Sequence, residues 1–291
     1  MHPATYKVVF CVCDYDLAAT LTSGQAFRWE ARDGGWTGVV RGRWLKLQQR
    51  GQSILAETSV PQTDWRWLAD YLQIALTLDD LLATFPDDPP MRAAIRACRG
   101  LRLLRQDPWE CLASFILSST KQIVQVRQIV ATLCERYGTP VAAPVGEPPA
   151  FAFPTATGLA DLTEVQLRAC KMGFRAPYLR ATARWIAEGK IDLEKLRRLD
   201  LAEARTRLLA LPGVGPKIAD CVLLFACGFP TAFPLDVWVL RALSELYFHG
   251  KRLTAAKLRT FSETHFGPHA GYAQQYLFHF IRTKHPEFIS R

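Results

Sequence analysis

The feature that most constrains the fold of this 291-residue chain is a Gly/Pro-rich apolar segment, Leu-Ala-Leu-Pro-Gly-Val-Gly-Pro-Lys, over residues 209–217. A helical pattern precedes the segment, and Pro216 suits the first position of a second helix. Gly213 and Gly215 permit a tight hairpin with positive φ between the two helices. The segment therefore predicts two helices joined by a hairpin, with Val214 packed into the core.

The predicted hairpin directs free backbone N–H groups outward at the N-terminus of the second helix. Such a terminus binds phosphate, and contacts of this kind hold the DNA backbone without reading the bases. The chain carries 36 Lys and Arg against 27 Asp and Glu, a formal charge of +9 that favours a polyanionic partner. We therefore predict a helix-hairpin-helix contact with DNA, with an ordinary corner between two helices as the simpler alternative.

Two ionisable residues beside the hairpin are candidates for catalysis. Lys217 enters an apolar helix at its N-terminus, and both surroundings favour the uncharged, nucleophilic amine. Asp236 follows in Phe-Pro-Leu-Asp-Val-Trp and is a natural N-cap for a further helix. The simpler roles are phosphate binding for the lysine and capping alone for the aspartate.

The order of the expected elements predicts an α+β fold. Close turn signals separate β-rich segments and indicate an antiparallel meander over residues 6–13, 36–40, 44–48 and 53–57. Beyond the Pro/Asp-rich residues 85–90, nearly all of the chain has a helical period. We expect an N-terminal antiparallel α/β domain over residues 1–98 and a helical domain over residues 99–291.

Membrane and metal-cluster proteins are not expected from this sequence. The longest apolar stretch, residues 218–227, is interrupted by Asp220 and is far shorter than the roughly 18–20 residues of a membrane span. The eight cysteines include no C-x2-C pair, which argues against zinc or iron–sulfur ligation. We expect no cofactor, and a structural cation on the hairpin carbonyls is left open. We also expect a monomeric, DNA-associated cytoplasmic protein, or a nuclear one in a eukaryotic host.

Several motifs, in the same order, resemble those of the 8-oxoguanine DNA glycosylases of the helix-hairpin-helix superfamily. They are the hairpin with Lys217, the Pro-x-Asp of Asp236, and residues 23–29, 103–112, 114–119 and 270–278. The resemblance covers nearly the whole chain and implies a helical domain of two subdomains with the DNA and base pocket between them. It also implies double-stranded DNA with 8-oxoguanine, preferentially opposite cytosine, as substrate.

The resemblance implies a bifunctional glycosylase and abasic-site lyase, because a lysine follows the hairpin. Lys217 would displace the flipped base and form a Schiff base with the sugar, after which β-elimination nicks the strand. Asp236 would stabilise the cationic sugar and assist proton transfer.

The base pocket implied by the resemblance is made of four residues. The carbonyl of Gly24 would detect the N7–H that distinguishes 8-oxoguanine from guanine, and Gln274 would bind the Watson–Crick edge. Phe278 and Cys221 would form the two walls, although core packing is the simpler role for both. Gln275 points elsewhere on the helix, and a solvated face is the simplest expectation for it.

The resemblance also implies DNA contacts outside the base pocket. Phe174 would fill the space left by the flipped base, with Arg175 beside it; the simpler alternative is a buried Phe174 and a surface Arg175. Thr120, Gln125 and Trp238 stand where eukaryotic members carry asparagine, arginine and histidine. We therefore expect a cytosine preference that is retained but weaker.

Two other functions remain as alternatives. A helix-hairpin-helix glycosylase for another damaged base is disfavoured by the combination of Gly24, Gln274 and Phe278. A non-catalytic DNA-binding protein is disfavoured by the pairing of Lys217 with Asp236, because gripping the DNA backbone requires neither residue.

Overall fold

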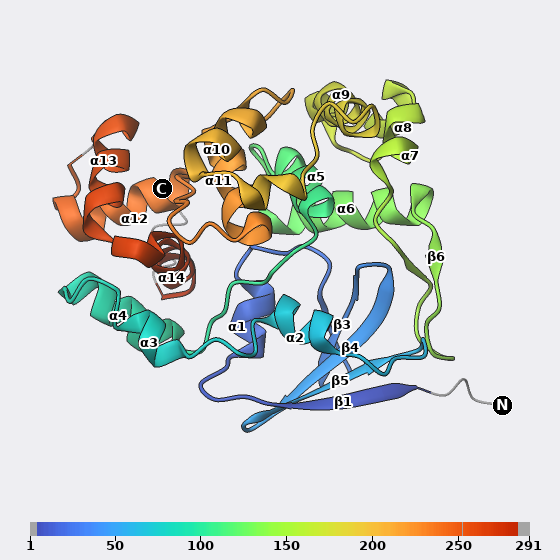
Figure 1. Cartoon of the computed structure of the whole chain (residues 1–291), viewed down its shortest axis with the longest axis horizontal. Coiled ribbons are helices and arrows are strands. Elements are labelled where there is room, and N and C mark those ends of the chain that lie inside the picture. The colour runs from blue at the N-terminus through green and yellow to red at the C-terminus, as the bar shows by residue number, and fades with distance from the viewer. Residues whose placement is uncertain (1–4, 252, 285–291) are drawn as a thin grey trace.

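A five-stranded antiparallel sheet forms one side of the molecule, and helices form the rest (Figure 1). The computed structural model describes residues 5–251 and 253–284. The strands pair in the order β1-β5-β4-β3-β2, and their bounds are β1 Tyr6–Cys11, β2 Glu30–Arg32, β3 Gly35–Val40, β4 Arg43–Arg50 and β5 Ser53–Thr58. The expected meander is confirmed in β1, β3, β4 and β5. Strand β2 was not expected, because three residues at a sheet edge leave little pattern to read.

The sheet has one buried face because its strands alternate in the burial of their side chains. In β5, Ile54 and Ala56 are fully buried while their neighbours are only partly so. This face packs against α1 (Leu17–Thr22) and α2 (Arg66–Leu72). The indole of Trp29 is buried between them and donates a 2.8 Å hydrogen bond to the hydroxyl of Tyr71.

Two helices of the N-terminal part pack with the C-terminal helices rather than with the sheet. Helix α4 (Pro89–Cys98), preceded by α3 (Leu78–Leu82), contacts α14 (Ala270–Lys284) near the end of the described chain. Met91 and Ala94 are fully buried in the same core as the helical part. Residues 78–98 are thus joined in space to the helical layer, and the division at residue 98 stays a prediction.

The helical part accounts for most of the chain after residue 107. Helix α5 (Pro108–Leu117) begins after Asp107, whose side chain accepts a hydrogen bond from the Glu110 N–H, with Pro108 in the first turn. The helices are α5 Pro108–Leu117, α6 Ile123–Tyr137, α7 Ala156–Asp161, α8 Glu164–Arg168, α9 Ala176–Ala187, α10 Leu201–Leu209, α11 Pro216–Val222, α12 Val237–Phe248, α13 Ala255–His265 and α14. A small pair of strands, β6 Pro140–Val141 and β7 Ala150–Phe151, lies between α6 and α7.

A buried ion-pair network fixes α11 to its neighbours. Asp220 is fully buried, and its carboxylate lies 2.8 Å from Nε of Arg205 on α10 and 3.2 Å from Nη1 of Arg259 on α13. A buried carboxylate without such partners would be strongly destabilising. Asp220 therefore interrupts the apolar stretch because it holds three helices together.

Among the residues that the structure describes, none of the helices has the length and apolar character needed to cross a membrane.

Candidate active site

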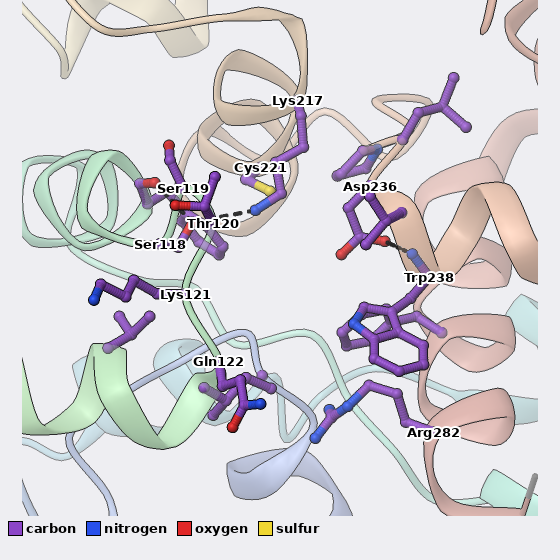
Figure 2. A pocket seen from close by; sticks show the side chains of 18 of the residues that line it. Ser118, Ser119, Thr120, Lys121, Gln122, Lys217, Cys221, Asp236, Trp238 and Arg282 are labelled. Atoms are coloured by element: carbon purple, nitrogen blue, oxygen red, sulfur yellow. Dashed lines mark hydrogen bonds between the residues drawn. The ribbon is translucent and has the colours of Figure 1, made fainter. Parts of the chain in front are cut away.

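A cavity of about 700 Å³ is lined by side chains from α5, α6, α11, α12 and α14 and by the loops between them (Figure 2). Lys217 and Asp236 both line it. All four expected base-pocket residues line it as well: Gly24, Cys221, Gln274 and Phe278. Thr120 and Trp238 also face the cavity, whereas Gln125, Phe174, Arg175 and hairpin residues 213–215 do not.

The amine of Lys217 lies between a polar and an aromatic wall of the cavity. Its Nζ donates to the hydroxyl of Ser118 at 3.3 Å and lies 4.9 Å from the ring centroid of Phe115. Cys221, one turn further along α11, is buried, and burial raises the pKa of its thiol to about 12. The neighbouring sulfur therefore stays protonated near neutral pH, while Lys217 is the candidate nucleophile facing the cavity.

Asp236 caps α12, as expected, and faces Lys217 across the cavity (Figure 2). Its Oδ1 accepts hydrogen bonds from the backbone N–H groups of Trp238 at 3.0 Å and Val239 at 2.9 Å. Burial raises the pKa of this carboxyl, and the two N–H donors and the charge of Lys217 act in the opposite direction. Both capping bonds use Oδ1, so Oδ2 takes no part in the cap. The capping role is therefore compatible with a second role for Asp236.

The opposite end of the cavity is tightly packed around Gly24. Its φ of +83° is in the left-handed region, and a β-carbon there would come within 2.7 Å of Ile123 Cδ1 and 3.3 Å of Phe278 Cε1. A side chain at this position would therefore strain the backbone and crowd Phe278. Gly24 is required for the close approach of its loop to α14.

Gln274 presents a buried polar atom at the same end. The residue is 3% exposed, and its Oε1 has no hydrogen-bond partner among the described residues. A buried acceptor without a donor is costly, so such atoms often mark a binding site. This carbonyl is suited to accept a hydrogen bond from a ring N–H.

The expectation that Gln275 lies on a solvated face is wrong. Gln275 is 2% exposed, and its Nε2 donates a 3.0 Å hydrogen bond to the carbonyl of Ser23. Helix α14 is buried around most of its circumference, because it packs against α4, α12 and the loop of Ser23 and Gly24. Both glutamines are therefore inside the protein, with different partners.

Arg282 and Ser118 line the cavity but were not among the expected site residues. Arg282 lies one turn after Phe278 and two turns after Gln274, so the i, i+4, i+8 spacing could have indicated it. Ser118 belongs to a segment that resembles the family, but nothing in its local pattern indicates contact with a lysine 99 positions later.

The simpler expectation, a buried Phe174 and a surface Arg175, is wrong. Phe174 is 54% exposed, while Arg175 is only 3% exposed. Arg175 donates from Nη2 to the hydroxyl of Thr120 at 2.5 Å, and its guanidinium lies 4.3 Å from the centroid of the Phe174 ring. The exposed ring and the buried arginine form one unit with Thr120, whose φ of +56° is unusual for a β-branched residue.

Gln125 has a local structural partner. Its side chain is exposed, and its Oε1 accepts a 3.1 Å hydrogen bond from the backbone N–H of Gln122 at the start of α6. Trp238 is partly buried at the start of α12, where its backbone N–H binds Asp236. Gln125 thus stabilises the first turn of α6 in this structure.

The hairpin between α10 and α11 is held in place by contacts with the protein core and with α9. Val214 is buried, as expected, and the carbonyl of Pro212 accepts a 2.8 Å hydrogen bond from the hydroxyl of Thr182 on α9. Gly213 has a φ of +77°, in agreement with the predicted hairpin, and Gly215 is extended with a φ of −97°. A β-carbon on Gly215 would meet no atom within 4 Å, which leaves the start of α11 open to a phosphate.

The described residues contain no group of three or more His, Cys, Asp or Glu side chains placed to hold a metal ion.

A DNA-repair fold is defined by this hairpin and cavity: residues 113–267 match the family model of the HhH-GPD superfamily of base excision DNA repair proteins. Residues 7–112 match the model of the N-terminal domain of 8-oxoguanine DNA glycosylase. With both matches in sequence, the chain belongs to the 8-oxoguanine DNA glycosylase family within that superfamily.

Relatives of similar length agree with this assignment. A probable N-glycosylase/DNA lyase of Methanothermobacter thermautotrophicus is 30% identical over 300 residues, which cover 93% of this chain and 95% of the relative. The solved structure of MBOgg1 with a low-affinity DNA ligand has a TM-score of 0.91 and 33% identity, covering 96% of each chain. Clostridium acetobutylicum 8-oxoguanine glycosylase/lyase, solved with double-stranded DNA containing cytosine opposite 8-oxoguanine, has a TM-score of 0.87 and 30% identity, covering 93% of this chain and 92% of that one.

Proposed function

We propose that this protein removes 8-oxoguanine from double-stranded DNA in base excision repair and then nicks the abasic strand. The observation that carries the proposal is one cavity lined by Lys217 and Asp236 together with Gly24, Gln274 and Phe278. A flipped nucleotide needs both a nucleophile at its sugar and a fitted pocket for its base.

The catalytic pair would act at C1′ of the flipped nucleotide. The amine of Lys217 forms a bond to C1′ while the glycosidic bond breaks and the base departs with the electron pair. The carboxylate of Asp236 stabilises the positive charge that develops on the sugar. The departing base or Asp236 accepts the amine proton. Ring opening then gives the Schiff base, and loss of a C2′ proton expels the 3′ phosphate.

The base would be recognised at the end of the cavity around Gly24. The carbonyl of Gly24 accepts the N7–H of 8-oxoguanine, and Gln274 pairs with the Watson–Crick edge. Phe278 and the protonated Cys221 enclose the two faces of the base. A site built around a ring N–H rejects guanine, because guanine leaves the buried acceptor unpaired.

The DNA would be held by contacts outside the cavity. The start of α11, including Gly213, Val214 and Gly215, binds backbone phosphate, and the exposed ring of Phe174 enters the stack where the base has left. Arg175 holds this ring and Thr120 in place. The proposed reaction requires no cofactor. We propose a monomer that is associated with the DNA of the cell and prefers cytosine opposite the lesion.

Covalent trapping tests the proposal directly. Borohydride reduces a Schiff base to a stable amine, so incubation with an 8-oxoguanine:cytosine duplex should yield a protein–DNA adduct. The matched duplex with guanine in place of the lesion should yield none. If the adduct forms only with a duplex that carries a different damaged base, the chain is a glycosylase for another lesion; retarded DNA without any adduct would indicate a binding protein.

A further inference from the structure

Arg282 is a basic residue of the cavity to which the proposed chemistry gives no role. It lies on α14 one turn after Phe278, and its guanidinium is 5.1 Å from the centroid of the Phe278 ring. Figure 2 shows its side chain directed toward the cavity beneath Trp238. Its charge is therefore placed at the end where the base would bind, away from the amine of Lys217.

One nitrogen of the partly buried Arg282, Nη1, is buried beside Gly24. A β-carbon on Gly24 would lie 3.4 Å from Nη1 of Arg282, and this nitrogen is buried without a hydrogen-bond partner among the described residues. Burial lowers the pKa of the guanidinium, and the charge of Asp236 opposes the shift. A buried donor without an acceptor is costly, so packing alone does not account for an arginine at this position.

Gln274, which lines the same cavity two turns before Arg282 on α14, provides the complementary observation. Its Oε1 is a buried acceptor without a donor, whereas Nη1 of Arg282 is a buried donor without an acceptor. A guest that satisfies both must present an N–H and an oxygen. The ring of 8-oxoguanine has carbonyl oxygens at C6 and C8, each next to a ring N–H, and so meets this requirement.

Resting on the proposed function, we propose that Arg282 donates a hydrogen bond to a carbonyl oxygen of the flipped 8-oxoguanine and is a further residue of the base-binding site. A phosphate is a less suitable acceptor, because Nη1 is buried against Gly24 and Phe278 rather than exposed at the surface. The departing base gains negative charge as the glycosidic bond breaks. A hydrogen bond from a cation therefore strengthens toward the transition state.

The test compares a DNA that carries the base with DNAs that lack it. Arg282→Met removes the donors and keeps most of the aliphatic stem. Single-turnover excision from an 8-oxoguanine:cytosine duplex should slow by about 10- to 100-fold, the usual effect of losing one charged hydrogen bond. Strand nicking at a preformed abasic site and binding to a tetrahydrofuran duplex, which has no base, should be unchanged. Arg282→Lys should recover part of the excision rate.

Arg241→Met is the matched control. Arg241 lies on α12 with its guanidinium 5.5 Å from the Trp238 ring, but it is exposed and does not line the cavity. This variant should excise at the wild-type rate. If Arg282→Met also loses tetrahydrofuran-duplex binding, Arg282 contacts the backbone and the inference is wrong.

Unchanged excision by Arg282→Met would also overturn the inference. If Arg282→Met does not fold, Arg282→Lys is the deciding variant. If its excision rate and its binding to an abasic-site duplex both decrease, Arg282 does not contact the base. A wild-type protein that excises no 8-oxoguanine refutes the proposed function itself, and the inference with it. Wild-type excision with a fully active Arg282→Met refutes only the role of Arg282.

Discussion

The side-chain amide of Gln275 donates a 3.0 Å hydrogen bond to the backbone carbonyl of Ser23, which joins α14 to the loop that carries Gly24. The two residues are 252 positions apart in the chain. Gln274 and Phe278 lie on the same helix, so this bond ties the loop of Gly24 to the helix that carries both residues.

Gln275→Ala should loosen the loop of Gly24 without touching the bound base. We expect a loss of about 1–2 kcal/mol in the free energy of unfolding, because the buried carbonyl of Ser23 is left unpaired. Excision of 8-oxoguanine should slow more than strand nicking at a preformed abasic site. Urea denaturation and single-turnover kinetics measure the two effects, and equal losses on both substrates would contradict this role.

Lys217→Gln should abolish base release and borohydride trapping while it leaves binding to damaged DNA largely intact. The reason is that the amide cannot form a Schiff base, whereas the hairpin and the base-binding end are unchanged. Lys121→Gln is the matched control, since Lys121 is another lysine that lines the cavity. A trapped adduct with Lys217→Gln would show that Lys217 is not the nucleophile, and its absence from Lys121→Gln as well would identify Lys121 as the trapped lysine.

Asp236→Asn should reduce turnover more than stability, because the amide oxygen can still cap α12 but carries no charge to stabilise the sugar cation. Burial raises the pKa of Asp236. The catalytic carboxylate should therefore be lost, as pH falls, at a higher pH than is usual for an aspartate. Stability depends on pH in the opposite direction: as pH rises through the raised pKa of this carboxyl, its ionisation lowers the free energy of unfolding.

A pH–rate profile of base excision checks the prediction for Asp236. The wild-type protein should show an acidic limb above the ordinary range of aspartate, and Asp236→Asn should lack this limb. Equal losses of stability and activity would support capping as the only role.

Gln125→Arg should sharpen the preference for cytosine opposite the lesion. An arginine can present several donors to the acceptor edge of cytosine, and each good bidentate contact is worth about 1–3 kcal/mol of discrimination. The wild-type chain should excise lesions opposite thymine, guanine and adenine more readily than relatives that carry the arginine and asparagine. Single-turnover rates on the four pairs measure this preference.

The structure supplies the control for Gln125. Gln125→Ala loses the hydrogen bond to Gln122 without adding a donor. It therefore distinguishes the effect of a destabilised first turn of α6 from the effect of a new arginine that contacts the opposite base. A strict preference in the wild type that Gln125→Arg does not change would place the readout elsewhere.

DNA binding should weaken steeply with salt. The net charge of +9 and the open N-terminus of α11 indicate a contact dominated by phosphate, and each neutralised phosphate adds a slope of about −0.9 in a log–log plot. Fluorescence anisotropy between about 50 and 200 mM salt measures the slope. A flat profile would contradict this binding mode.

The sequence predicts well what is encoded locally. The hairpin, Val214 in the core and Asp236 as a cap each depend on residues within one or two turns of each other. The burial of Gln275 is not encoded locally, because it depends on the packing of α14 against α4 and the Ser23 loop, both distant in sequence.

Helix α11 has only seven residues, yet it carries the N–H groups of the hairpin, Lys217, and Asp220 with its two arginine partners. Groups carried by one short, rigid helix move together. If the DNA backbone is bound at the start of α11 and this helix shifts slightly, the bound strand and the amine of Lys217 shift with it, and the distance between them is preserved. The tolerance of the reaction to imperfect docking would then be set by one helix, which the buried Asp220 ties to α10 and α13.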